Sequence, residues 1–221
     1  MTHKLEADGI ELSFGTRKIL KSVYLNCETN VVTGLLGRNG EGKSCLMNII
    51  YGSLKADIRS VRFNGTSVLQ AFKRPDLLTY LPQFNFVPAI LTLKRVFNDF
   101  ELAFADFEAA FPEFAGRERA KVGQLSGGQR RLLEVYLIIQ SKSQFSMLDE
   151  PFSNIMPLHI EKIKELIQAT KPRKGFLITD HYYQHIMELG DRLYLLREGQ
   201  THLCQSRADL EWFGYVSQLV Q

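Results

Sequence analysis

The stretch GRNGEGKS, from Gly37 to Ser44, combines residue types that hold phosphate groups and follows the pattern GxxxxGK[ST]. It lies between an apolar run, VVTGLL, and a helical pattern, KSCLMNIIY. Glycines let the backbone wrap around phosphates, Lys43 brings a positive charge to the β- and γ-phosphates, and the Ser44 hydroxyl suits magnesium. A glycine-rich turn without a ligand is the alternative, but an unpaired buried lysine would be costly. We therefore predict a phosphate site formed by Gly37, Arg38, Asn39, Gly40, Glu41, Gly42, Lys43, Ser44 and Cys45.

Two carboxylates, Asp149 and Glu150, end a second apolar run, FSML. Ligands of parallel sheets bind at the carboxyl ends of the strands, so both side chains are expected to face the ligand. Asp149 suits a magnesium ligand, directly or through water, and Glu150 suits the base that orients an attacking water. Two carboxylates at a strand end are also common on protein surfaces, but the phosphate loop upstream favours the functional interpretation.

The stretch LSGGQ, Leu125 to Gln129, predicts a second anion site. A serine and two glycines stand directly before a helical pattern, where free N–H groups and the helix dipole point at an anion. Because the phosphate loop is already complete, this second site must serve another purpose.

Alternating strand and helix patterns surround these residues. Residues 5–15, 21–28, 31–37, 60–65 and 77–83 have strand patterns, and from residue 127 helices and strands alternate up to residue 198. The alternation predicts an α/β fold whose sheet is largely parallel, with helices on both faces. An antiparallel β part is expected near the N-terminus.

A phenylalanine-rich segment between residues 92 and 111 interrupts this alternation. Its spacing of three and four residues predicts one helix with a single apolar stripe, formed by Phe97, Phe100, Phe104, Phe107 and Phe111. Pro112 and Gly116 are expected to end this helix. The segment predicts a small inserted helical unit whose core is the stripe.

In combination, GRNGEGKS, LSGGQ and MLDEP resemble the nucleotide-binding domain of ABC-family ATPases. Gln129 precedes Asp149 by 20 residues, as that family requires, and the likeness covers nearly the whole chain. The resemblance implies an ATPase that uses ATP and Mg²⁺. It also implies a P-loop (RecA-like) α/β core over residues 1–83 and 126–221, with a helical subdomain over residues 84–125.

The resemblance implies roles for three further side chains. Phe14, 23 residues before Gly37, matches an aromatic that stacks on adenine, although a core phenylalanine at a strand end is the alternative. Gln83 matches the glutamine that reaches magnesium and the attacking water, and His181 matches the histidine that contacts the γ-phosphate. His181 and His185 are spaced for zinc on a helix, but no third ligand is evident, so His185 is expected at the surface or in packing.

The same resemblance implies a role for the second anion site, the LSGGQ stretch, which is the signature of the family. The family packs two ATPase subunits head to tail, and the signature residues of one cap the γ-phosphate held by the other. The partner would be a second copy of this chain or a homologous subunit. The signature residues that would cap the partner's γ-phosphate are Ser126, Gly127, Gly128 and Gln129. One position departs from the family: Met156 stands where an aspartate normally meets the partner's phosphate loop. We expect a more apolar contact and slower basal turnover, unless Asn154 or a backbone carbonyl substitutes.

The composition is that of a soluble globular protein, with 45% hydrophobic and 23% charged residues among 221. The net charge of +3 is too small to predict a nucleic-acid surface. Three widely spaced cysteines, Cys27, Cys45 and Cys204, favour reduced thiols in the cytosol over disulfides or a metal pair. The sequence shows neither a membrane span nor the apolar core of a signal peptide.

A membrane role would therefore come through a partner. The leading interpretation is the ATPase subunit of a transporter, attached to the inner face of the membrane through a permease on another chain. A soluble ABC protein acting on nucleic acid or the ribosome is the alternative, but neither a long heptad run nor a basic linker is visible. Glu150 disfavours a regulatory module without turnover. The C-terminal residues 208–221 are expected either to cover the core or to meet a partner.

Overall fold

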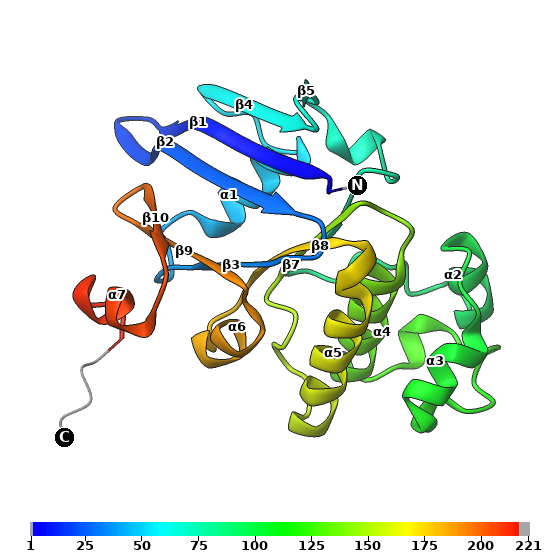
Figure 1. Ribbon diagram of the computed structural model, residues 1–221. Coiled ribbons are helices and arrows are strands. Elements are labelled where there is room, and N and C mark those ends of the chain that lie inside the picture. The colour runs from blue at the N-terminus through cyan, green and yellow to red at the C-terminus, as the bar shows by residue number, and fades with distance from the viewer. Residues whose placement is uncertain (1, 217–221) are drawn as a thin grey trace, which may run out of the picture.

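The computed structural model describes residues 2–216, so residues 217–221 of the C-terminal stretch lie outside the described part (Figure 1). Two sheets form the frame of the molecule. The antiparallel sheet has the order β2-β1-β4-β5, with β1 Lys4–Phe14, β2 Arg17–Glu28, β4 Ile58–Phe63 and β5 Thr66–Ser67. The second sheet has the order β10-β9-β3-β8-β7-β6, with β3 Val32–Leu36, β6 Leu78–Leu81, β7 Phe145–Asp149, β8 Gly175–Thr179, β9 Arg192–Arg197 and β10 Gln200–Cys204.

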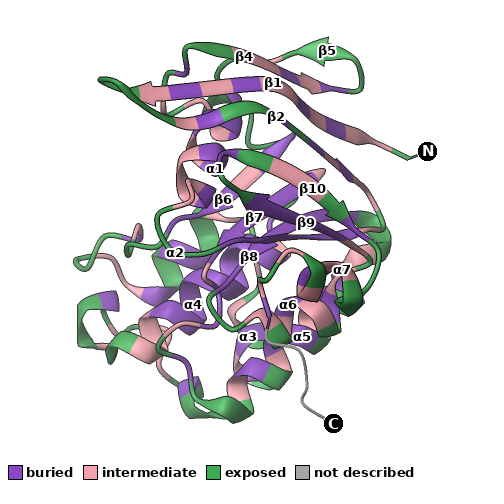
Figure 2. Ribbon diagram, turned by 90° about the vertical axis from the view of Figure 1, so that its left-hand side faces the viewer, coloured by how far each residue is buried: buried purple, intermediate pink, exposed green. Residues whose placement is uncertain are grey.

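The second sheet is parallel except for β10, which pairs antiparallel with β9. Every residue of β3, β7 and β8 is buried, as expected for apolar strands covered on both faces. Figure 2 shows β7 and β8 in the colour of buried residues. In β1, by contrast, buried residues largely alternate with partly exposed ones, as in a sheet with one solvated face. The expected α/β fold, with an antiparallel part near the N-terminus, is confirmed.

The helices cover the parallel sheet on both sides. Helix α1, Lys43–Tyr51, lies between the two sheets, where its apolar residues join one hydrophobic cluster with β1 and β2 (Figure 1). The opposite face is covered by α4 Gly127–Gln140, α5 Pro157–Thr170 and α6 Tyr183–Leu189, which belong to the other cluster. The C-terminal helix α7, Arg207–Trp212, packs beside β10. Short 3₁₀ turns occupy Ala71–Lys73, Pro112–Phe114, Val122–Gln124 and Lys171–Arg173.

The phenylalanine segment forms two helices rather than the single helix predicted, α2 Leu93–Asp99 and α3 Phe104–Ala110. In a straight helix, Phe97 and Phe107 would be separated by about 15 Å along the axis. Their rings instead lie 5.2 Å apart, and the ring of Phe104 lies 5.1 Å from that of Phe97. The chain reverses at Glu101, which has a positive φ of 54°. Folding back brings more aromatic surface together, and all five phenylalanines join the cluster beneath α4, as the core prediction required.

Within residues 2–216, no helix has the length and apolar character needed to cross a membrane.

Candidate nucleotide site

The predicted phosphate loop connects the end of β3 to the start of α1. Gly42, with φ of +102°, precedes the first residue of the helix, and a β-carbon there would lie 2.9 Å from the Ile19 side chain. Glycine is therefore required both by the backbone angle and by the space. Together with neighbouring elements, the loop borders a cleft of about 510 Å³, a volume typical of small-ligand sites.

Lys43 is buried at the floor of this loop. Its Nζ donates to the carbonyl oxygens of Gly37, at 2.7 Å, and Arg38, at 3.2 Å. Burial lowers the pKa of Lys43, and the nearby carboxylates of Asp149 and Glu150 act in the opposite direction. The ammonium group thus lies at the cleft, where two backbone carbonyl groups of the loop hold it.

The other predicted polar residues converge beside it. The Gln83 Nε2 donates to Ser44 Oγ at 3.1 Å, to Asp149 Oδ1 at 3.4 Å and to Glu150 Oε1 at 2.7 Å. The second carboxylate oxygen of Glu150 lies 2.8 Å from His181 Nε2. Four segments that are distant in sequence therefore bring all five side chains to the carboxyl edge of the parallel sheet. The structure thus brings together Ser44, Asp149 and Glu150, which were chosen from the motifs, and Gln83 and His181, which were chosen from the family resemblance.

Ser44, Gln83 and Asp149 carry oxygen atoms of the kind that Mg²⁺ prefers, and Mg²⁺ takes few side-chain ligands and keeps several waters. In the structure the Gln83 amide directs its Nε2 toward Ser44 and Asp149, so it would have to turn over to offer its oxygen to the ion. Asp149 is buried, which raises the pKa of its carboxyl, while hydrogen bonds from Ser44, Tyr80 and Gln83 lower it. The Tyr80 hydroxyl donates to Asp149 Oδ2 at 3.1 Å. Tyr80 was not predicted, and its only signal in the sequence is its position three residues before Gln83 on an apolar strand.

Phe14 lies at the mouth of the cleft, at the end of β1, with 54% of its surface exposed. An exposed ring at this place suits stacking on a planar base, and its exposure disfavours the alternative of a core phenylalanine. Arg17 and Ile19, on the next strand, line the same mouth and were not predicted. Their signal would have been the hairpin that begins directly after Phe14.

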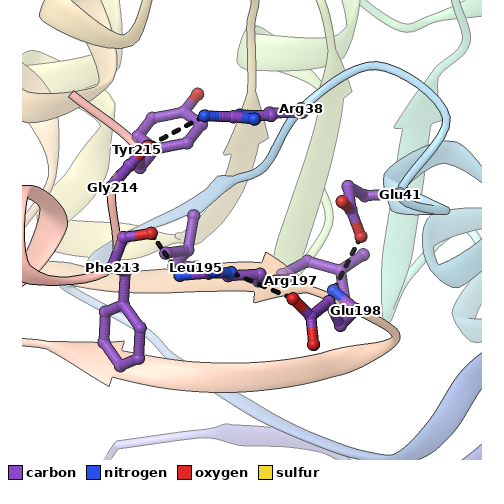
Figure 3. Close-up of a pocket in the computed structure, with 9 residues that line it drawn as sticks. Arg38, Glu41, Leu195, Arg197, Glu198, Phe213, Gly214 and Tyr215 are labelled. Atoms are coloured by element: carbon purple, nitrogen blue, oxygen red, sulfur yellow. Dashed lines mark hydrogen bonds and ion pairs between the residues drawn. The ribbon is translucent and has the colours of Figure 1, made fainter. Parts of the chain in front are cut away.

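The side chains of Arg38 and Glu41, in the phosphate loop, point away from the cleft. In this orientation the two side chains do not face a nucleotide bound there. The Arg38 Nη2 donates to the carbonyl oxygen of Gly214 at 2.9 Å, and Glu41 accepts from the backbone N–H of Glu198 at 2.8 Å (Figure 3). They border a separate hollow of about 200 Å³ behind the loop, closed by residues 213–215. Arg38 and Glu41 thus fix the phosphate loop on the side away from the cleft. Residues 213–215 lie next to the loop on that side.

The signature residues lie outside the cleft, at the start of α4. The Ser126 Oγ accepts from the N–H of Gln129, and the Gln129 Oε1 accepts from the N–H of Ser126, both at 3.2 Å. This capping box fixes the start of the helix. The structure therefore separates the predicted residues into a cleft group and a signature group within one chain.

His185 packs its ring against Phe152, with centroids 5.1 Å apart. Helix α6 begins at Tyr183, so His181 precedes the helix that carries His185. The two histidines therefore do not share a helix face, and His185 has a packing role.

Residues 20–153 match the ABC transporter family. The chain belongs to this family. A probable ABC transporter ATP-binding protein of Azorhizobium caulinodans is 31% identical over 209 residues, which cover 88% of this chain and 74% of the relative. The lipopolysaccharide export system ATP-binding protein LptB of Haemophilus influenzae is 28% identical, over 89% of this chain and 88% of that protein.

Solved structures support the ABC fold. The ATP-binding subunit of an ABC transporter superposes with a TM-score of 0.79 at 20% identity, covering 97% of this chain and 95% of that one. A nucleotide-free ATP-binding cassette from an ABC transporter gives a TM-score of 0.76 at 22% identity. The recognition of the family from three short motifs is thus confirmed, and the chain is an ABC ATPase.

Proposed function

We propose that the chain is the ATP-hydrolysing subunit of a membrane transporter and that it works as a head-to-tail dimer around two Mg·ATP. The observation that carries this proposal is the separation of the two predicted groups. The cleft holds Lys43, Ser44, Gln83, Glu150 and His181, while the signature residues face elsewhere. A signature supplied by a second subunit, either another copy or a homologous ATPase, would complete each cleft.

Within the cleft, each side chain has a task that follows from its position. Lys43 would exchange its carbonyl partners for the β- and γ-phosphates, and Phe14 would stack on adenine. Ser44, Gln83 and Asp149 would hold Mg²⁺, which neutralises phosphate charge when bound.

Glu150 is the proposed general base of the cleft. Its carboxylate would orient the attacking water and accept its proton. Gln83 would fix one oxygen of Glu150, at 2.7 Å, and His181 the other, at 2.8 Å. The base would thus be oriented before the water arrives, and His181 would also reach the γ-phosphate.

The permease would dock beside the helical segment. Phe84 and Ile90, which follow Gln83, expose 71% and 79% of their surfaces, while Val87 between them is buried. Two large exposed apolar side chains in one short segment favour a protein partner. We propose that residues 84–125 act as a helical subdomain on an α/β core of residues 1–83 and 126–221. A permease helix would contact both parts and hold the chain at the cytoplasmic face of the membrane.

A mixing experiment tests the head-to-tail arrangement. Chains that carry Ser126→Arg are expected to be inactive alone, because the bulky cation prevents the signature from capping the partner's nucleotide. Chains that carry Lys43→Ala are also expected to be inactive alone, because their phosphate site is lost. In a mixed dimer, one composite site has an intact phosphate loop and an intact signature. The mixture should therefore recover measurable ATPase activity, with each variant mixed with itself as the control. Two inactive variants whose mixture recovers nothing would contradict the arrangement.

Met156 offers a second test of the interface. It is the N-cap residue of α5, it exposes 64% of its surface, and its side chain makes no capping hydrogen bond within the described residues. Met156→Asp is expected to raise the basal ATPase rate without tighter ATP binding, because a carboxylate would again help to align the water across the interface.

The control for this substitution is Met156→Asn. Both asparagine and aspartate are good N-caps, worth about 1 kcal/mol over a residue that does not cap, so both variants should be similarly stabilised. Only the aspartate supplies the charge. If the rate after Met156→Asp is unchanged, or rises equally in both variants, Met156 has only a packing role.

A further inference from the structure

Arg131, on α4, is a buried cation that the proposed mechanism does not use. Only 5% of its surface is exposed. Its Nη1 donates to the carbonyl oxygen of Pro82 at 2.7 Å, and its Nη2 donates to those of Asp149, at 2.6 Å, and Glu150, at 3.0 Å. All three acceptors are backbone atoms in the two segments that carry the water-handling side chains.

The Glu150 backbone needs such support. Its φ is +55°, in the left-handed region that residues with a β-carbon rarely adopt. Its N–H donates to the carbonyl oxygen of Thr179 at 2.8 Å, which holds one side of the residue. The Arg131 guanidinium holds the carbonyl groups on either side of the strained residue. Strained backbone persists at functional sites only when the surrounding structure fixes it in this way.

The same guanidinium fixes the neighbouring segment. Pro82 directly precedes Gln83, whose amide contacts Glu150 at 2.7 Å. One rigid, planar group therefore sets the separation between the Gln83 segment and the end of β7. A lysine would not replace it, because an ammonium is a point charge on a flexible stem and cannot span the three carbonyl groups with a fixed fork.

The local charge also favours a cation at this place. The carboxylates of Asp149, Glu150, Glu134 and Asp180 surround Arg131. Burial lowers the pKa of Arg131, and these carboxylates act in the opposite direction. A neutral side chain would remove a buried cation from the acidic end of β7, where Lys43 is also buried.

We propose that Arg131 is a positioning residue for ATP hydrolysis, which holds the backbone of Glu150 and Gln83 in register without touching the nucleotide. This inference rests on the proposed role of Glu150 as the base. It predicts that Arg131 affects the hydrolytic step far more than ATP binding, since the phosphate loop and Phe14 belong to other segments.

The test uses Arg131→Lys in the full-length chain. We expect turnover to fall by roughly 100-fold, the scale of a 1 Å misplacement of a catalytic group, while ATP affinity stays within about threefold of the wild type. The matched control is Arg192→Lys, which replaces a half-buried arginine that binds Asn26 and Glu28 on β2. This control should retain wild-type turnover. A parallel loss of ATP affinity and turnover in Arg131→Lys would overturn the proposal, because it would indicate a general structural role.

A double variant separates this inference from the proposed function. If Arg131 acts through Glu150, adding Arg131→Lys to Glu150→Gln should slow the residual turnover by less than threefold, because residues that act as a unit are not additive. A full 100-fold further loss of turnover in the double variant would overturn the positioning role of Arg131. It would not affect the proposed role of Glu150 as the base. Normal turnover in Glu150→Gln alone would instead refute the proposed function. Arg131→Gln serves as a second variant, and if neither Arg131 variant folds, Arg131 is a folding requirement and the proposal is wrong.

Discussion

Lys43→Ala is expected to abolish measurable ATP binding. Lys43 carries the positive charge nearest to where the β- and γ-phosphates would lie, and its ammonium group is held at 2.7 Å from the Gly37 carbonyl inside the loop. Alanine removes both the charge and the contact that shapes the loop. The measurement is a titration of the variant with labelled ATP in the presence of magnesium, followed to concentrations far above the wild-type Kd.

An exposed lysine provides the control for this substitution. Lys142 pairs with Glu101 at 2.9 Å on the surface, where such ion pairs contribute little to stability. Lys142→Ala should bind ATP like the wild type. Near-native affinity in Lys43→Ala would refute the assignment of the phosphate loop.

Glu150→Gln is expected to bind ATP normally and to reduce turnover by roughly 10²–10⁴-fold, the usual contribution of a general base. That loss corresponds to about 3–5 kcal/mol of activation free energy. Glutamine has the same shape and can still accept from Gln83 through its amide oxygen, so the cleft should keep its geometry. What it loses is the carboxylate that takes the proton from water.

Steady-state phosphate release measures this prediction, with Glu188→Gln as the control. Glu188 is a carboxylate paired with Lys164 between α5 and α6, away from the cleft. The control should hydrolyse ATP at the wild-type rate. Wild-type turnover in Glu150→Gln would mean that another group activates the water.

The sequence was sufficient to predict the parts of the site that are local. The phosphate loop, the carboxylates at the end of β7 and the start of α4 are each encoded in a few consecutive residues. The loop joins a strand to a helix as expected, the carboxylates end a strand, and the signature begins a helix. Gln83 and His181 followed from the family resemblance, because neither has a local pattern of its own. In the structure both side chains contact the Glu150 carboxylate, while their expected roles toward magnesium, water and the γ-phosphate stay predictions.

Long-range contacts account for what was missed. Arg131 looks like an ordinary helical arginine until folding brings Pro82 and Asp149 to its guanidinium. The outward direction of Arg38 depends on Gly214, 176 residues later in the chain. The reversal at Glu101 could not be found from the phenylalanine spacing, because a spacing of three and four residues fits one long helix equally well. These features are set by packing between distant segments and not by local pattern.

The central claim, that ATP holds two chains head to tail, is tested most directly by measuring the mass of Glu150→Gln by light scattering with and without Mg·ATP. We predict the mass of one chain without nucleotide and of two chains with saturating Mg·ATP, because the slowed base preserves the bound nucleotide. In the double variant that also carries Ser126→Arg, the mass with saturating Mg·ATP should again be that of one chain. A mass that stays at one chain with saturating Mg·ATP, or a dimer that forms regardless of ATP and of Ser126→Arg, would contradict the account.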